Sequence, residues 1–150
     1  MYKRILVAVD GSTTSARALQ EAIRVAQGGG GVLRLVHVVN ELVIGREYAP
    51  AVYYESAIVS LRAAGEEVLQ RTRAVVQQAG VPFEATLVET VGGRAADDIV
   101  RIAQEWPADL IVMGTHGRRG LSRLVMGSDA ELVVRASPAP VLIVRGEPEE

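Results

Sequence analysis

Apolar residues along the chain form short unbroken runs that alternate with longer stretches of helical spacing. The first run, residues 4 to 9, is aliphatic and β-branched without polar alternation, which is typical of a parallel strand covered on both faces. Residues 13 to 27 carry apolar side chains on one helical face: Leu19, Ala22, Ile23 and Ala26. With Ser12 or Thr13 as the N-cap, the chain opens with a strand that leads directly into a helix.

The same alternation continues along the rest of the chain. Gly28 to Gly31 follow a helix and precede a strand, so they are interpreted as a helix stop and a turn. Residues 40 to 54 show no clear period and contain Gly45 and Pro50, so they are predicted to form a long loop that could act as a flap. Further strands are predicted over residues 32–39, 83–90, 109–114 and 141–144, and further helices over 55–79, 94–105 and 128–136.

The predicted order is βαβαβαβαβ, which gives one α/β domain of 150 residues with a parallel sheet between helices. Such sheets bind ligands beyond the C-terminal ends of their strands, where the strand order reverses. That point is expected to bring together Asp10 after the first strand, the Val38–Val39 end of the second strand and the loop after the fourth strand.

The most informative stretch runs from Val112 to Ser128, between a strand and a helix. Gly114 and Gly117 allow positive φ and close backbone approach, so successive N–H groups can turn inward around an anion. Gly127 and Ser128 stand at the start of a helix, where unpaired N–H groups and the helix dipole favour a phosphate. The loop adds positive charge without any acid: Arg118, Arg119 and Arg123. The stretch therefore predicts phosphate binding.

Each of these features also has a purely structural explanation. Glycines in a strand-to-helix loop often serve only the turn, and Ser128 with Glu131 has the spacing of a capping box. The three arginines are equally compatible with a solvated face. The argument for phosphate rests on the combination of glycines, spacing and position at the favoured end of a parallel sheet.

Composition excludes several classes of enzyme. Lys3 is the single lysine among sixteen basic residues, which excludes P-loop NTPases, protein kinases and lysine Schiff-base enzymes. The first strand is not followed by Gly-x-Gly-x-x-Gly, and no Gly-x-Ser-x-Gly occurs, so a dinucleotide oxidoreductase and a serine hydrolase are also excluded. Without cysteine and with two histidines, neither a thiolate chemistry nor a histidine-rich metal site is expected.

Charge and hydropathy indicate the expected surroundings. A net charge of −2 without a basic stripe argues against nucleic acid as a partner. No apolar run approaches the ~18 residues of a membrane span, and the start of the chain lacks the features of a signal peptide. Together with the absence of cysteine, these observations predict a cytoplasmic protein.

The loop pattern and four other segments carry a resemblance to a known family. They are the loop pattern Gly114-x-x-Gly117, nine residues, Gly127-Ser128, the opening segment 5–12, the strands 35–38 and 109–114, and the closing segment 138–144. In type and order these segments resemble the universal stress proteins of the ATP-binding type. The resemblance covers the whole chain and implies a Rossmann-like three-layer sandwich, similar to the adenine nucleotide alpha hydrolases, with a five-stranded parallel sheet in the order 3-2-1-4-5.

The resemblance also implies a set of binding residues. In ATP-binding members, the residue matching Asp10 contacts the ribose, the main chain matching Val38 reads the adenine edge, and Ala8 lies where the base packs. The loop and the turn after it wrap the phosphates, which a Mg²⁺ ion bridges: Met113, Gly114, Thr115, His116, Gly117, Arg118, Arg119, Gly127, Ser128 and Asp129. Members usually form a homodimer through the last strand, here Val141–Val144.

Individual residues keep alternative explanations. Asp10 could instead cap the first helix or form an Asx turn with Gly11 and Ser12, and His37 is interpreted as a satisfied structural histidine. His116 could touch the γ-phosphate or face solvent. Asp129 departs from the family pattern, which commonly has a small or apolar residue at this position, and its carboxylate would repel phosphates unless it turns outward. Alternatively, it stabilises the first helical turn.

The favoured function is an ATP-dependent binding or regulatory module in stress response, with at most slow hydrolysis, because the phosphate cradle lacks an evident general base. The alternatives are an adenylate-forming or nucleotide-hydrolysing enzyme with Asp10 or His116 as a catalytic group, and a binder of another adenylate such as cyclic AMP. Homodimerisation has a physical reason as well, because Val141–Val144 is a flat, uncharged strand that needs a partner if it lies at an edge. A further protein partner is left open.

Overall fold

The strand β1 (Arg4–Ala8) is the centre of a five-stranded parallel sheet in the computed structural model, which describes residues 1–40, 51–90, 92–116 and 126–146. On one side of it lie β2 (Val32–Asn40) and then β3 (Phe83–Thr90). On the other side lie β4 (Leu110–Gly114) and then β5 (Val141–Val144). The α/β class is the one that the sequence predicts, and the order β3-β2-β1-β4-β5 is the one that the family resemblance implies.

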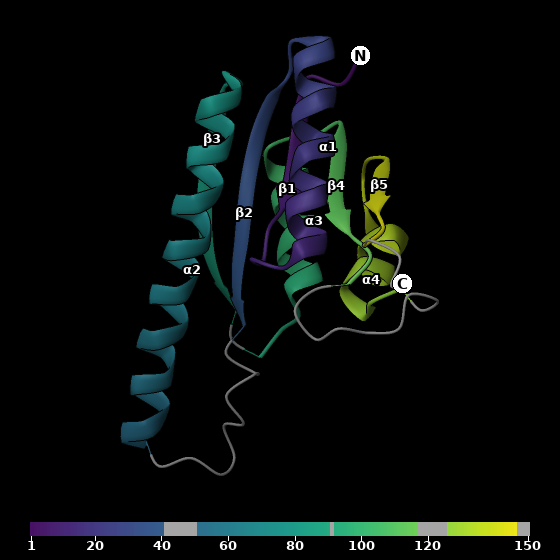
Figure 1. Ribbon diagram of the computed structural model, residues 1–150. Helices are drawn as coiled ribbons and strands as arrows, with labels where there is room; N and C mark the ends of the chain where they lie inside the picture. Colours follow the sequence, from purple (N-terminus) through teal and green to yellow (C-terminus); the bar gives the residue numbers. More distant parts are fainter. Residues whose placement is uncertain (41–50, 91, 117–125, 147–150) are drawn as a thin grey trace.

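In the part of the chain that the structure describes, four helices cover the sheet in two layers (Figure 1). α1 (Thr13–Gly29) and α2 (Ala51–Ala79) contribute Leu19, Ile23, Leu69 and Val76 to a core cluster on one face. On the opposite face, α3 (Ala95–Glu105) and α4 (Ser128–Ala136) contribute Ile99, Ile102 and Val133 to a second cluster. The sheet is therefore the middle layer of a three-layer sandwich.

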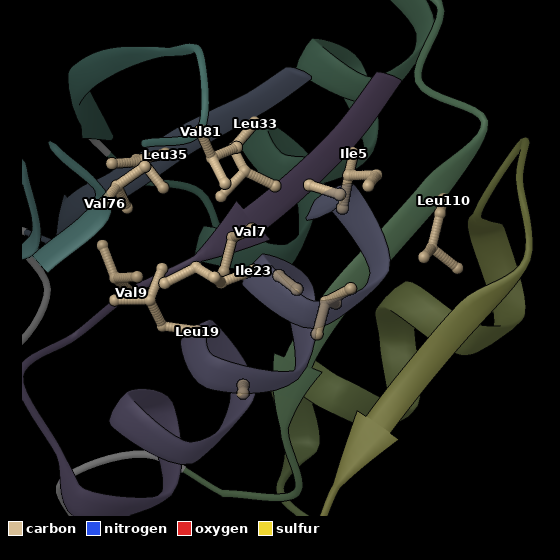
Figure 2. Packing of buried hydrophobic residues seen from close by; sticks show 14 of the residues in the cluster. Ile5, Val7, Val9, Leu19, Ile23, Leu33, Leu35, Val76, Val81 and Leu110 are labelled. Carbon is tan, nitrogen blue, oxygen red and sulfur yellow. The ribbon is translucent and has the colours of Figure 1, made fainter. Parts of the chain in front are cut away.

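The unbroken apolar run of β1 follows from burial on both faces. Ile5, Val7 and Val9 join the α1–α2 cluster, and Figure 2 shows Val7 beside Ile23 and Val9 beside Leu19. Leu6 points to the opposite cluster. Ile5, Leu6 and Val7 are all 0% exposed, so none of these three positions can carry a polar side chain in alternation.

The boundaries of α1 confirm the predicted cap and the glycine stop. The Ser12 hydroxyl accepts the Ser15 N–H at 3.1 Å, so Ser12 is the N-cap. The helix continues two residues beyond the predicted end, through Gly29, and finishes at Gly30 in the left-handed conformation with φ 68°.

The predicted loop over residues 40–54 is partly wrong. Asn40 still belongs to β2, and α2 begins at Ala51, four residues before the predicted start at Glu55. Tyr54, Ile58 and Leu61 continue the helical spacing upstream, which the cluster of tyrosines obscures in the sequence. The remainder of the expected flap, residues 41–50, lies outside the described residues.

α2 approaches the sheet closely at Gly65. A Cβ atom at this buried glycine would lie 2.8 Å from His37 Cδ2 of β2 and 2.8 Å from Leu87 Cδ1 of β3. Near this contact, Arg62 forms a two-bonded ion pair with Glu89 at the end of β3. The hydrogen bond from Arg62 lowers the pKa of the Glu89 carboxyl. Because Gly65 has no side chain, α2 can approach β2 and β3 this closely.

We expect Gly65→Ala to lower the free energy of unfolding by about 1–3 kcal/mol, because the added methyl overpacks the contact with His37 and Leu87. Gly28→Ala is the matched control within a helix, since its added Cβ would come no closer than 3.7 Å to Met1 Cε. The control should be neutral or stabilising by up to about 1 kcal/mol, because alanine favours helix over glycine. Urea denaturation measures both changes, and an equal response of the two variants would contradict the packing argument.

Candidate functional site

The candidate site lies where the strand order reverses, at the carboxyl ends of β1 and β4. From β1 the chain proceeds outward through β2 to β3, and then crosses back so that β4 pairs with the other side of β1. All pairs are parallel, so the carboxyl ends of the strands point to the same edge of the sheet, where α1 and α4 begin (Figure 1). Sheets of this class bind ligands at this reversal point.

Asp10 is held in an Asx turn directly after β1. The Ser12 N–H donates to Asp10 Oδ1 at 2.8 Å, and Gly11 between them has a left-handed φ of 83°. The Asx alternative is therefore present, whereas the helix-capping alternative is not, because Ser12 caps α1. Within the described parts of the chain, Asp10 Oδ2 accepts no hydrogen bond. The turn leaves one carboxylate oxygen available to a ligand.

Ala8 and Val38 lie beside Asp10 on the two central strands. Ala8 pairs with Val36, so Val38 lies two residues further along β2, at the level of Asp10. The side chains of Ala8 and Val38 are partly buried and pack against the cluster on the α3–α4 face. The structure thus brings together the three residues that the resemblance assigns to base and ribose.

Thr115 and Gly127, near the two ends of the strand-to-helix loop, are in direct contact. The Gly127 N–H donates to the Thr115 carbonyl at 2.6 Å, and the Thr115 N–H donates to the Val144 carbonyl of β5 at 2.9 Å. A Cβ atom at Gly127 would lie 3.0 Å from the Thr115 carbonyl oxygen and 3.2 Å from His116 Cα. Gly127 is therefore required by a close backbone approach that brings the start of α4 to the end of β4.

Of the two properties that a glycine allows at position 114, the structure uses the close approach and not a positive φ. Gly114 is the last residue of β4 and is not among the described glycines with a positive φ. Its Cβ would lie 2.6 Å from Thr14 Cγ2, so the first turn of α1 leaves no room for a side chain. Residues 117–125 of the predicted loop lie outside the described residues, and with them the predicted site residues Gly117, Arg118, Arg119 and Arg123.

The start of α4 has no side-chain cap. Gly127 is the N-cap, and Ser128 is an exposed first helical residue. The capping box expected from Ser128 and Glu131 is wrong, because a glycine occupies the cap position and Glu131 instead pairs with Arg135 at 2.9 Å. The first-turn N–H groups of α4 and its positive dipole end therefore favour an anion at this edge of the sheet. Asp129, in the same turn, is half-buried and contributes a negative charge.

The two histidines have different environments. His37 Nδ1 lies 2.8 Å from the Val9 carbonyl oxygen, which confirms the structural interpretation of this residue. His116 is half-buried, and its Nδ1 lies 3.1 Å from Thr115 Oγ1. No group of three or more His, Cys, Asp or Glu side chains is placed to hold a metal ion among the residues that the structure describes. In the same parts of the chain, no helix has the length and apolar character needed to span a membrane.

Two buried side chains at this edge of the sheet were not predicted from the sequence. Thr14, 6% exposed, fixes the space beside Gly114, and Ser15, 5% exposed, accepts the Asp10 N–H through Oγ at 3.1 Å. The spacing Ser12-x-x-Ser15 after a strand and a glycine is a signal for such a hydrogen-bonded turn. Nothing in the sequence signals the contact of Thr14 with Gly114, because it joins segments that lie far apart along the chain.

Comparison with known proteins identifies relatives along the whole chain. A universal stress protein from Thermus aquaticus is 37% identical over 145 residues, which are 97% of this chain and 100% of that protein. The universal stress protein MJ0531 from Methanocaldococcus jannaschii is 32% identical over 151 residues, covering 100% of this chain and 86% of the relative.

Solved structures share the fold. The protein MJ0577 superimposes with a TM-score of 0.87 at 27% identity and covers 99% of both chains. A universal stress protein in complex with cAMP has a TM-score of 0.66 at 26% identity, covering 97% of this chain and 98% of the other. The universal stress protein from Archaeoglobus fulgidus in complex with dAMP has a TM-score of 0.69 at 26% identity, covering 95% and 98%.

The family model described as the universal stress protein family matches residues 1–145 of the chain. The shared fold, the order of the strands and the similarity to the Thermus and Methanocaldococcus proteins agree with this match. The chain therefore belongs to the universal stress protein family.

Proposed function

We propose that the chain binds ATP at the carboxyl edge of its sheet and acts as a nucleotide-dependent binding module. The observation that carries the proposal is the start of α4, where uncapped N–H groups lie next to the end of β4 because Gly127 is hydrogen-bonded to Thr115. This arrangement favours a phosphate chain at the reversal point of the sheet. Two relatives were solved with the adenine nucleotides cAMP and dAMP, which supports an adenylate as the ligand.

The adenosine end of the ligand belongs, in this proposal, beside β1 and β2. The partly buried side chains of Ala8 and Val38 offer an apolar surface for the base. Asp10 Oδ2 accepts a ribose hydroxyl, while Oδ1 stays engaged in the Asx turn with Ser12. A carboxylate is a suitable acceptor here, because hydrogen bonds to charged groups are stronger than those between neutral groups.

The phosphate end belongs between residues 113–119 and the Gly127–Asp129 turn. The cradle supplies main-chain donors from the start of α4, and Arg118 and Arg119 supply positive charge. Mg²⁺ fits as an ion that arrives with the phosphates, because it is usually held by one or two carboxylates together with phosphate oxygens. Asp129 is a carboxylate at the right turn for this role, and a bound Mg²⁺ would offset its repulsion of the phosphates.

At most slow hydrolysis is expected from these residues. His37 is engaged by the Val9 carbonyl, and His116 pairs with the Thr115 hydroxyl. Asp10 binds the ribose in this proposal. None of the side chains of His37, His116 and Asp10 is therefore assigned as a general base for water. We place the module in the cytoplasm, on the absence of cysteine in the sequence.

We also propose that the chain forms a homodimer through β5. β5 is an edge strand of the described sheet, and its sequence Val141–Val144 carries no charge. Leu142 is 37% exposed at this edge. An uncharged edge strand favours pairing with a second copy.

Isothermal titration with Mg²⁺ tests the nucleotide proposal. We expect the wild-type protein to bind ATP below millimolar concentration, and AMP about tenfold or more weakly, because AMP lacks the phosphates that the α4 amides and arginines would contact. Asp10→Asn should weaken both nucleotides by a similar factor of about ten, because it acts at the ribose. Glu66→Gln removes the same charge from an exposed position of α2 and should change neither affinity. Absence of binding by ATP, ADP, AMP and cAMP alike would refute the proposal, whereas binding of cAMP alone would favour the cyclic nucleotide.

A second experiment separates packing from binding at Gly114. Without nucleotide, Gly114→Ala should lower the free energy of unfolding by about 1–3 kcal/mol, because the added Cβ meets Thr14 Cγ2 at 2.6 Å. Thr14→Ser removes that methyl, so the double variant should regain part of the loss, with a coupling energy of about 0.5 kcal/mol or more. Additive effects in a urea-denaturation cycle would show that Thr14 is not the reason for the glycine.

The dimer proposal predicts that Leu142→Lys halves the mass measured by light scattering at micromolar concentration, because a charge on an edge strand opposes pairing. Val59→Lys introduces the same charge at a valine that is 61% exposed on α2, so this control should remain dimeric. A monomeric wild-type protein, or dissociation of both variants, would count against pairing through β5.

A further inference from the structure

Asp10 belongs to a closed ring of hydrogen bonds with two serines. The Asp10 N–H donates to Ser15 Oγ at 3.1 Å, the Ser15 N–H donates to Ser12 Oγ at 3.1 Å, and the Ser12 N–H donates to Asp10 Oδ1 at 2.8 Å. Each residue in the ring is thus both a donor and an acceptor. The ring fixes the main chain and the carboxylate of Asp10 together, relative to the first turn of α1.

Ser15 supports this ring from inside the protein. It is 5% exposed, whereas Asp10 and Ser12 are half-buried, so Ser15 lies behind the candidate site and cannot form much of its surface. Its hydroxyl oxygen is the acceptor for the Asp10 amide, which lies beyond the last residue of β1. Removal of this hydroxyl would leave the Asp10 N–H without its acceptor and would open the ring on one side.

The residue before Asp10 is held independently by β2. The Val9 N–H donates to the Val36 carbonyl at 2.9 Å, and the Val9 carbonyl accepts from His37 Nδ1 at 2.8 Å. Val9 therefore stays in place if the ring opens, and the change is confined to the turn that carries the carboxylate. This local effect allows the role of the ring to be measured in a folded protein.

We propose that Ser15 is a positioning residue that sets how strongly the site discriminates between nucleotides with and without ribose hydroxyls. The inference rests on the proposed function, in which Asp10 Oδ2 accepts a ribose hydroxyl. Hydrogen bonds weaken steeply when their angle departs from linearity, so the strength of this contact depends on how well the carboxylate is oriented. Ser15 supplies that orientation without touching the nucleotide.

The ring should affect how strongly the site prefers nucleotides with ribose hydroxyls over nucleotides without them, because the phosphates are bound elsewhere in the proposed function. In the proposed function the main-chain phosphate donors come from the start of α4, whereas the hydrogen bonds of the ring involve only Asp10, Ser12 and Ser15. Loss of the ring should therefore weaken ATP while leaving an analogue without ribose hydroxyls almost unaffected. A loss of stability alone would weaken both ligands to the same extent.

The experiment compares ATP with 2′,3′-dideoxyATP by isothermal titration at a temperature where every variant is folded. The wild-type protein should prefer ATP by about ten- to 100-fold, the range expected of hydrogen bonds between hydroxyls and a carboxylate. Ser15→Ala should reduce this preference to about threefold or less through a weaker affinity for ATP, with little change for the dideoxy analogue. Ser15→Cys keeps the volume but provides a weak acceptor, so it should behave like Ser15→Ala. Ser15→Thr retains the hydroxyl and should restore the preference.

Thr72→Val is the control for loss of a buried hydroxyl elsewhere. Thr72 is 8% exposed in α2, and its Oγ1 donates to the Val68 carbonyl at 2.7 Å, so the variant should lose stability but keep the wild-type preference. An unchanged preference in Ser15→Ala would overturn the inference while ATP binding stands. If Asp10→Asn also keeps the preference, the assignment of Asp10 to the ribose is wrong as well. If the wild-type protein binds neither nucleotide, the proposed function itself is refuted.

Discussion

Burial of β1 on both faces is the constraint on which the candidate site depends. Ile5, Leu6 and Val7 have no exposed surface, so a polar side chain at any of these three positions would be buried without a partner. Polar chemistry on this segment can begin only where the strand ends. Asp10 is the first such residue beyond β1, and the same constraint on β4 places Thr115 and His116 directly after its buried residues. The order of the strands then brings both ends to one edge of the sheet.

The elements could be predicted from the sequence where local chemistry decides them. Unbroken apolar runs give the strands, and Gly30 with its left-handed φ of 68° ends α1 close to where the glycine run predicts. The start of α2 could not be predicted in the same way. Tyr54 keeps the helical spacing, but the cluster of tyrosines around it obscures the pattern of apolar and polar positions. Periodicity is a weak guide where a helix turn carries few buried residues, and Tyr53 is 69% exposed.

The candidate site was less predictable, because its glycines respond to contacts between distant segments. Gly114 is adjacent to Thr14 of α1, and Gly127 lies against the Thr115 carbonyl. Both positions exclude a side chain even without a ligand, so the spacing of these glycines does not by itself establish phosphate binding. The predicted capping box is wrong for a related reason. Gly127, which lies against Thr115, occupies the N-cap position in place of Ser128, and Glu131 forms an ion pair with Arg135.

These contacts divide the site into two parts with different physical origins. The part next to Asp10 is preorganised by a ring of hydrogen bonds within six consecutive residues, Asp10 to Ser15, so it needs no ligand to reach its geometry. The part next to α4 depends on the hydrogen bond between Gly127 and Thr115, whose positions are 12 residues apart along the chain. Preorganised contacts lose little conformational entropy on binding, whereas contacts that join separate segments can respond to what is bound. A nucleotide held in this way would be recognised through its nucleoside by the first part, and changes in its phosphate chain would act on the second part, next to β4 and the edge strand β5.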